Sequence, residues 1–195
     1  MENKPNSIWN LPNKLTVSRV LLTPVFIVFA ELANHTGGRL YYLLAAVVFA
    51  VASYTDLLDG KIARSRNLVS SFGKFMDPLA DKVLTTTALL YMMAAGVCHP
   101  IVLVLVLTRE FAVAGLRMVA AGSKNGKVIA ANVYGKIKTV AQMCTVLLYY
   151  TAAAVFGSVA WVQVLANVCC WIVAGLTLLS GTIYLYENRS FLYAE

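Results

Sequence analysis

The chain carries four carboxylates in two linked segments, Asp56-Leu57-Leu58-Asp59-Gly60-Lys61-Ile62-Ala63-Arg64 and Gly73-Lys74-Phe75-Met76-Asp77-Pro78-Leu79-Ala80-Asp81, inside an otherwise apolar sequence. Asp56 and Asp59 are three residues apart and Asp77 and Asp81 are four apart, so on helices each pair shares one face. Ionisable side chains at bilayer depth are costly and usually face a bundle interior or a wet cavity. Four carboxylates gathered there would repel one another, so we expect a divalent cation between them. Hard oxygen ligands suit Mg²⁺ or Mn²⁺. The alternative is two unrelated acidic helix ends beside a cytoplasmic loop.

The composition excludes an ordinary soluble domain. Of the 195 residues, 59% are hydrophobic and only 13% are charged, whereas soluble domains carry about 25% charged residues. Runs of about 20 apolar residues can each cross the hydrocarbon core of a bilayer. We therefore predict a single all-α membrane domain over residues 1–195, with a short N-terminal interfacial segment that ends near Arg19. Its six transmembrane helices are expected at about 15–34, 39–59, 77–97, 100–121, 134–156 and 159–186.

The positive charge is distributed unevenly between the two ends of these spans. The chain has a net charge of +7, and most Lys and Arg residues fall in the termini and in the 60–76 and 121–138 connections. The opposite turns, near 35–39, 97–100 and 157–159, carry only Arg39. Because short cytoplasmic loops are enriched in Lys and Arg, we expect both termini and the aspartates to face the cytoplasm. Anionic lipid headgroups account for the basic side, so no nucleic-acid partner is expected.

The spacing of the acidic segments matches a known signature. The pattern Asp-x2-Asp-Gly-x2-Ala-Arg-x8-Gly-x3-Asp-x3-Asp resembles that of the CDP-alcohol phosphotransferase family. Its eight fixed positions are filled by Asp56, Asp59, Gly60, Ala63, Arg64, Gly73, Asp77 and Asp81. The resemblance implies transfer of a phosphatidyl group from CDP-diacylglycerol to an alcohol, with release of CMP. It also implies two metal ions, held by Asp56, Asp59 and Asp77, with Asp81 on the second ion.

The other residues of this motif suit a nucleotide diphosphate. Gly60 and Ala63 keep one face shallow, so that a phosphorylated ligand can approach the backbone, and Arg64 offers a planar fork for phosphate oxygens. With Gly73, these residues are predicted to bind the CDP moiety. Asp81 is the best candidate for the general base that takes the proton of the attacking hydroxyl. For Asp77 an alternative stays open, because Asp before Pro is also typical of a helix N-cap.

A second cationic cluster, in the fourth and fifth spans, suggests a phosphorylated acceptor. A neutral alcohol would not need additional cations away from the diphosphate. The segments Arg109-Glu110-Phe111, Leu116-Arg117 and Gly135-Lys136-Ile137-Lys138-Thr139 resemble the bacterial phosphatidylglycerophosphate synthase branch of the family, as does the run from Asn10 to Arg19. The resemblance implies sn-glycerol 3-phosphate as acceptor and a homodimer. The predicted ligands of the acceptor phosphate are Arg109, Arg117 and Lys138, with Lys136 and Arg19 as weaker candidates.

Other interpretations of these residues remain open. Arg109 could form a purely structural ion pair, Glu110 projects to a different face and could pair with another helix, and Lys136 could extend towards the interface as a snorkelling side chain. Inositol phosphate is the nearest alternative acceptor. Intramembrane carboxylates also occur in divalent-cation transporters, but the outer half of this chain offers no polar route. A lipid-binding protein without catalysis is a further alternative.

Overall fold

Six helices account for the chain in the computed structural model, which describes residues 11–65, 71–122 and 133–189. Side chains are described for residues 16–55, 79–80, 82–120 and 133–189. The helices are α1 (Leu11–Thr36), α2 (Arg39–Ser65), α3 (Ser71–Ala94), α4 (Pro100–Gly122), α5 (Val133–Phe156) and α6 (Ala160–Glu187). No strand occurs within the described ranges. The expectation of an all-α architecture with six helices is confirmed.

Two helix starts differ from the sequence-based bounds. Helix α1 begins at Leu11, so most of the expected interfacial segment is continuous with the first helix, and residues 1–10 lie outside the described residues. Helix α3 begins at Ser71, six residues before Asp77. Serine is favoured at helix N-termini, which is consistent with a helix that begins at Ser71 and not at Asp77. Asp77 therefore lies inside α3, and the N-cap alternative for it is wrong.

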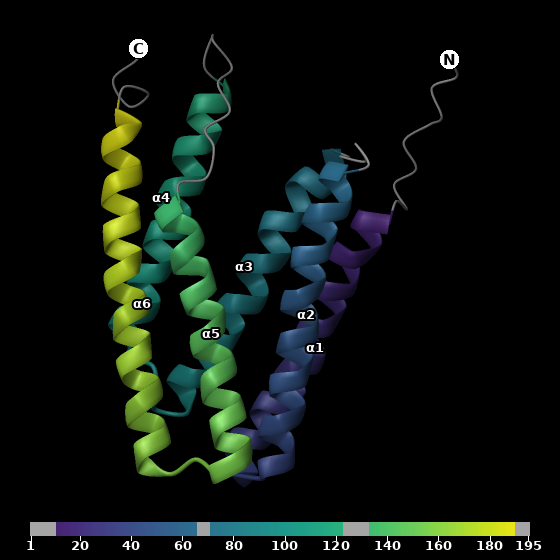
Figure 1. Cartoon of the computed structure of the whole chain (residues 1–195), viewed down its shortest axis with the longest axis vertical. Coiled ribbons are helices and arrows are strands. Elements are labelled where there is room, and N and C mark those ends of the chain that lie inside the picture. Colours follow the sequence, from purple (N-terminus) through teal and green to yellow (C-terminus); the bar gives the residue numbers. More distant parts are fainter. Residues whose placement is uncertain (1–10, 66–70, 123–132, 190–195) are drawn as a thin grey trace.

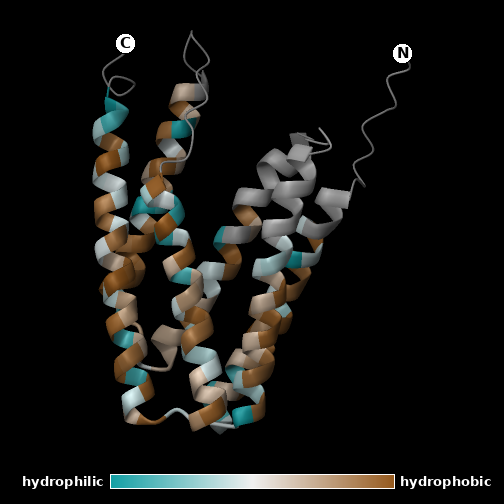
Figure 2. Ribbon diagram, in the orientation of Figure 1, coloured by the Kyte–Doolittle hydropathy of each residue, from teal (hydrophilic) through white to brown (hydrophobic). Residues whose placement is uncertain are grey.

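Three helices are long and apolar enough to cross a membrane: Thr16–Thr36, Val133–Phe156 and Ala160–Glu187, among the residues that the structure describes. The apolar parts of α2 and α3 are shorter, at Arg39–Thr55 and Lys82–Ala94, and α4 is interrupted by charged residues. Figure 2 shows apolar residues at many positions along α5 and α6. Helices of this length and apolar composition are typical of a membrane protein. Among the described residues, three helices meet this requirement.

Aromatic rings hold α1, α2 and α5 together. The Phe26 ring lies 5.9 Å from that of Phe49 and 5.4 Å from that of Tyr150, measured between centroids. Near the turn between α3 and α4, the Asn167 amide of α6 donates a 2.7 Å hydrogen bond to the Val97 carbonyl. Helix α5 contacts both α2 and α6, and α4 packs on α6.

Because the helices run alternately up and down, both chain ends lie at one end of the bundle (Figure 1). The C-terminal end of α2 and the start of α3, which carry the aspartates, lie at that same end.

Candidate functional site

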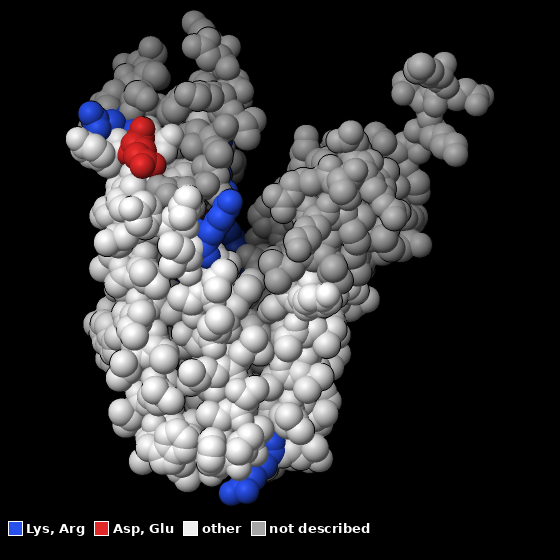
Figure 3. Space-filling model, in the orientation of Figure 1, with Lys and Arg blue, Asp and Glu red and all other residues white. Residues whose placement is uncertain are grey.

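A cavity of about 330 Å³ opens between α3, α4 and α5. One part of its wall is apolar and includes Val83, Val106 and Phe111. The other part is polar and is formed by Lys82, Thr85, Thr86, Thr87, Glu110, Lys138, Thr139 and Gln142. In the space-filling view, cationic side chains gather in the hollow between the two halves of the bundle (Figure 3). The cavity therefore offers a cationic wall beside an apolar one, which suits a small anionic molecule with a carbon skeleton.

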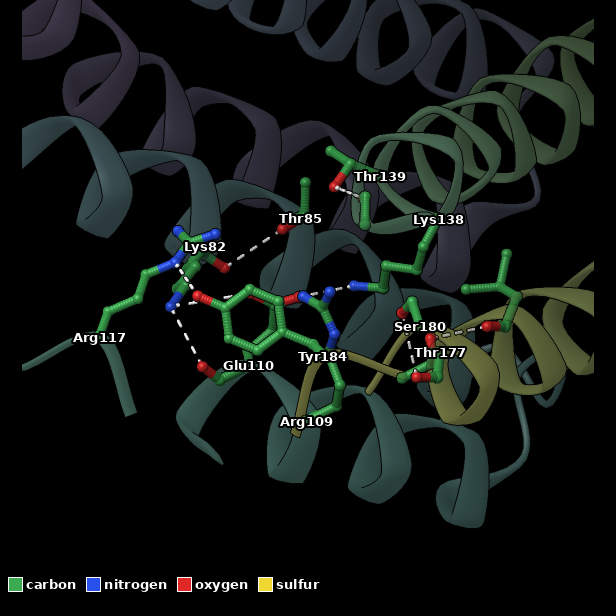
Figure 4. A network of polar contacts seen from close by, with 12 residues as sticks. Lys82, Thr85, Arg109, Glu110, Arg117, Lys138, Thr139, Thr177, Ser180 and Tyr184 are labelled. Carbon is green, nitrogen blue, oxygen red and sulfur yellow. Dashed lines mark hydrogen bonds and ion pairs between the residues drawn. The ribbon is translucent and has the colours of Figure 1, made fainter. Parts of the chain in front are cut away.

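Glu110 is the centre of a polar network that joins three helices (Figure 4). Its Oε1 accepts hydrogen bonds from Lys138 Nζ of α5 at 2.9 Å and from Arg109 Nη1 at 3.0 Å. Lys82 Nζ of α3 lies 3.7 Å from Oε2 and donates to the Glu110 main-chain carbonyl at 3.5 Å. The expectation that Glu110 pairs with another helix is confirmed, and its neighbour Arg109 shares the same carboxylate.

Burial explains why these charges lie together. The Lys138 side chain is only 3% exposed and that of Arg109 12%. A buried charge is strongly destabilising unless it is paired and hydrogen-bonded. Glu110 supplies the compensating charge for both, and it lies in the same helix as Arg109 and opposite Lys138. The network therefore fixes how α4 and α5 face each other around the cavity.

Arg109 occupies a narrow space that two glycines leave open. A Cβ atom at Gly181 of α6 would lie 3.0 Å from Arg109 Cγ, and one at Gly135 of α5 would lie 3.0 Å from its Nη2. Both separations are shorter than normal van der Waals contacts. Arg109 is not among the described residues that line the cavity. Its side chain instead passes between α5 and α6 and reaches Glu110.

The other predicted phosphate ligands lie in different surroundings. Arg117 is exposed, and its Nε donates a 3.0 Å hydrogen bond to the Tyr184 hydroxyl of α6, with the guanidinium carbon 5.5 Å from the Tyr184 ring centroid. Lys136 is exposed on α5, and Arg19 is fully buried in α1. The structure thus brings Arg109 and Lys138 together through Glu110, whereas Arg117 pairs with α6. The roles of these residues in binding a phosphate stay predictions.

The motif residues fall on α2 and α3, and of these two helices only α3 contributes described residues to the cavity lining. Asp56, Asp59, Gly60, Ala63 and Arg64 belong to α2, and Gly73, Asp77 and Asp81 belong to α3. Their side chains lie outside the described residues, in which no group of three metal-ligating side chains occurs. Asp81 immediately precedes Lys82, which lines the cavity. The donor set of four carboxylates consists only of hard oxygen ligands, which fits Mg²⁺ or Mn²⁺.

Sequence reasoning missed three contributors to this site. Lys82 could have been found, because a lysine inside an apolar span is itself unusual. Tyr184 and Gly181 could not, because an aromatic residue and a glycine among apolar residues have many ordinary roles in membrane helices. Only the packing of α6 against α4 gives these two residues a specific contact.

Comparison with known proteins identifies relatives over nearly the whole chain. Residues 9–179 match the model of the CDP-alcohol phosphatidyltransferase family. A protein of Bacillus subtilis (strain 168), named CDP-diacylglycerol–glycerol-3-phosphate 3-phosphatidyltransferase, is 40% identical over 93% of this chain and 96% of its own length. Proteins of the same name from Rickettsia felis and Rickettsia prowazekii are 36% and 35% identical, over 90% and 93% of this chain and 93% and 97% of their own lengths. No solved structure matches the chain.

Replacing Gly181 by Ala should destabilise the protein by forcing Arg109 to move. Overpacking typically costs about 1–3 kcal/mol, and Cγ is too close to the α4 backbone to retreat easily. Gly175→Ala on the same helix is the matched control, because a Cβ atom there would meet nothing within 4 Å. Thermal unfolding in detergent measures both variants. In an Arg109→Ala background the cost of Gly181→Ala should disappear, and an unchanged cost would show that Arg109 is not the obstacle.

Proposed function

Because this chain belongs to the CDP-alcohol phosphatidyltransferase family, we propose that it transfers the phosphatidyl group of CDP-diacylglycerol to sn-glycerol 3-phosphate, giving phosphatidylglycerol phosphate and CMP. The names of the relatives from Bacillus subtilis and Rickettsia support this reaction. The observation that carries the choice of acceptor is that Lys82 and Lys138 both line the cavity, beside an apolar part of its wall. A phosphorylated acceptor needs such a wall, whereas a neutral one does not.

The cavity favours two lysines as the groups that meet the acceptor phosphate. Lys82 and Lys138 both line it, and they contact Glu110 from two different helices, α3 and α5. An ammonium group on a flexible stem can turn towards a phosphate that enters beside it. Arg109 contacts Glu110 of this wall, whereas Arg117 contacts Tyr184 of α6. Lys136 and Arg19 stay weaker candidates. The apolar part of the wall suits the glycerol carbons.

The acidic motif supplies the remaining chemistry. Asp81 takes the proton of the acceptor hydroxyl, whose oxygen forms a bond to the phosphorus that carries the diacylglycerol. The bond from that phosphorus to the CMP oxygen breaks, and CMP leaves. Asp56, Asp59, Asp77 and Asp81 would hold divalent ions, Mg²⁺ or Mn²⁺, whose chemistry here is neutralisation of the diphosphate charge. Gly60, Ala63, Arg64 and Gly73 bind the CDP moiety beside them.

The membrane arrangement follows from the substrates. We propose that all six helices span the cytoplasmic membrane, with both termini and the acidic motif on the cytoplasmic side. Acyl tails then remain in lipid while the nucleotide and glycerol 3-phosphate enter from the cytoplasm. The one-sided distribution of Lys and Arg supports this orientation. A homodimer is proposed from the family alone.

The purified protein tests the reaction directly. It should release CMP from CDP-diacylglycerol with Mg²⁺ and glycerol 3-phosphate, and not with glycerol, serine or inositol. Faster turnover with inositol phosphate would leave the family assignment unchanged, but it would make inositol phosphate the acceptor in place of glycerol 3-phosphate. No CMP release with any acceptor, together with uptake of divalent cations into vesicles, would favour the transporter alternative.

Activity should depend completely on Mg²⁺ or Mn²⁺. Asp56→Asn, Asp59→Asn and Asp77→Asn should each weaken metal activation, because each removes one anionic oxygen ligand. Asp81→Asn should still bind CDP-diacylglycerol but should lose roughly 10²-fold or more in turnover, as expected for a general base. Measuring CMP release over a series of Mg²⁺ concentrations distinguishes the three metal-ligand variants from the general-base variant Asp81→Asn. Full activity in excess chelator, or near-normal turnover of Asp81→Asn, would contradict these assignments.

Lys138→Met should raise the KM for glycerol 3-phosphate by roughly tenfold to a hundredfold, because a charge-assisted bond to phosphate contributes about 1.5–3 kcal/mol. The KM for CDP-diacylglycerol should stay nearly constant. Lys136→Met is a comparison on the same helix, since Lys136 is exposed and does not belong to the described lining of the cavity. If only the KM for CDP-diacylglycerol rises, Lys138 binds the diphosphate of that substrate and not the acceptor phosphate.

Cysteine labelling in intact cells should distinguish the two faces of the membrane. In a background without native cysteines, Thr36→Cys and Ser158→Cys should react with an impermeant reagent, and Asn67→Cys and Ser123→Cys should be protected. Thr36 and Ser158 are preferable to Gly37 and Gly157, whose φ angles of 65° and 84° disfavour a side chain. External labelling at position 67 would invert the orientation and separate the acidic motif from its cytoplasmic substrate.

A further inference from the structure

One polar side chain of the cavity wall has no hydrogen-bond partner within the described part of the chain. Gln142 of α5 lines the cavity, and it is only 4% exposed. Its carboxamide carries N–H donors and a carbonyl acceptor, and among the described residues none of these groups is used. Because a buried amide without hydrogen bonds is costly, we expect its bonds to come from a molecule that occupies the cavity.

Several other polar groups of the cavity wall already have hydrogen bonds. The Thr139 hydroxyl donates to a main-chain carbonyl of its own helix at 3.0 Å, and the Thr85 hydroxyl does so at 3.4 Å. Lys138 Nζ donates to Glu110 Oε1 at 2.9 Å. Gln142 differs from these groups, because no contact with a described residue competes with a ligand for its amide.

Gln142 lies one helical turn beyond Lys138 on the same face of α5. Residues four apart on a helix are neighbours on its surface, and this pair is separated by about 6 Å along the helix axis. A lysine can only donate hydrogen bonds, whereas an amide both donates and accepts them. A phosphate of a monoanionic or dianionic ester mainly accepts, whereas a hydroxyl does both. This face of α5 therefore complements a phosphate with a hydroxyl close to it.

We propose that Gln142 is a specificity-determining residue of the acceptor site, whose amide binds a hydroxyl on the carbon next to the one that carries the acceptor phosphate. The proposal rests on the phosphorylated acceptor and on the role of Lys138 proposed above. Gln142 Oε1 accepts the proton of that hydroxyl, and Nε2 stays available to another oxygen of the ligand. The class of acceptor is thereby narrowed to phosphate monoesters with a neighbouring hydroxyl, to which glycerol 3-phosphate belongs.

A buried amide gives selectivity mainly by rejecting the wrong ligand. Any acceptor that fills the cavity displaces water from the Gln142 amide. A hydroxyl replaces the hydrogen bonds that are lost, whereas a methylene group at the same place leaves the amide buried and unpaired. Sites that hydrogen-bond a substrate hydroxyl discriminate strongly against analogues that lack it, much more than apolar pockets discriminate by size.

The test compares glycerol 3-phosphate with propane-1,3-diol monophosphate, which keeps the phosphate and the attacking hydroxyl but lacks the hydroxyl on the middle carbon. CMP release gives kcat/KM for each ligand. Thermal unfolding of detergent-purified protein over a series of ligand concentrations gives an apparent Kd without turnover. Wild-type protein should prefer glycerol 3-phosphate by roughly tenfold to a hundredfold in both measurements. A preference below about twofold would overturn the proposal.

Gln142→Met removes the amide at nearly constant volume and should abolish this preference. Binding of glycerol 3-phosphate should weaken until the two ligands differ by less than about threefold, while binding of the analogue changes little. An equal loss for both ligands would show a purely structural role and would overturn the proposal. Thr145→Val is the matched control, because Thr145 is buried on the same helix, is outside the described cavity lining, and already donates to a carbonyl at 2.8 Å. It should keep the wild-type preference.

Two further comparisons keep the outcome unambiguous. If Gln142→Met does not yield folded protein, Gln142→Asn withdraws the amide by one methylene and should reduce the preference at least about threefold, and an unchanged preference contradicts the proposal. If the unfolding measurements show the preference and its loss but no CMP is released, the proposed reaction fails while the hydroxyl site stands. Equal turnover of both ligands retains the reaction and overturns the role of Gln142, and the absence of both binding and turnover overturns the two together.

Discussion

The pairing of Glu110 with cations from three helices is the interaction on which the arrangement of the site depends. Lys138 and Arg109 are buried in an apolar bundle, where an uncompensated charge would cost several kcal/mol. One carboxylate compensates both and also attracts Lys82. Because Lys82, Glu110 and Lys138 belong to α3, α4 and α5, their mutual attraction orients these helices around the cavity that they line. The cavity has lysines on its wall because Glu110 holds Lys82 and Lys138 towards it from two helices.

Packing against α6 restrains one of these cations, Arg109. The contact of α4 with α6 depends on small residues, and Gly181 allows the Arg109 stem to pass. Without a hydrophobic driving force between membrane helices, such close contacts are a main source of helix association. The same feature that brings the helices together thus restrains Arg109.

Much of the fold could be predicted from the sequence, because apolar runs and charge asymmetry are direct consequences of the bilayer. Six helices were expected and six are described, but the start of α3 was placed too late because Asp77-Pro78 has the pattern of a helix start, whereas Ser71 already begins the helix. The acidic motif was recognisable because its spacing is fixed. The acceptor wall was only partly predictable. Lys138 was found as part of a cationic cluster in the fourth and fifth spans. The central role of Glu110 depends on which helix faces α4, and sequence periodicity does not specify that neighbour.

A structure of the protein determined with bound glycerol 3-phosphate is the most direct measurement of the central claim, that the lysines around Glu110 receive the acceptor phosphate. The account predicts phosphate oxygens at hydrogen-bonding distance, about 2.7–3.2 Å, from Lys138 Nζ. A phosphate bound by Arg109 or Arg117 outside the cavity, with the Lys138–Glu110 pair intact, would contradict it.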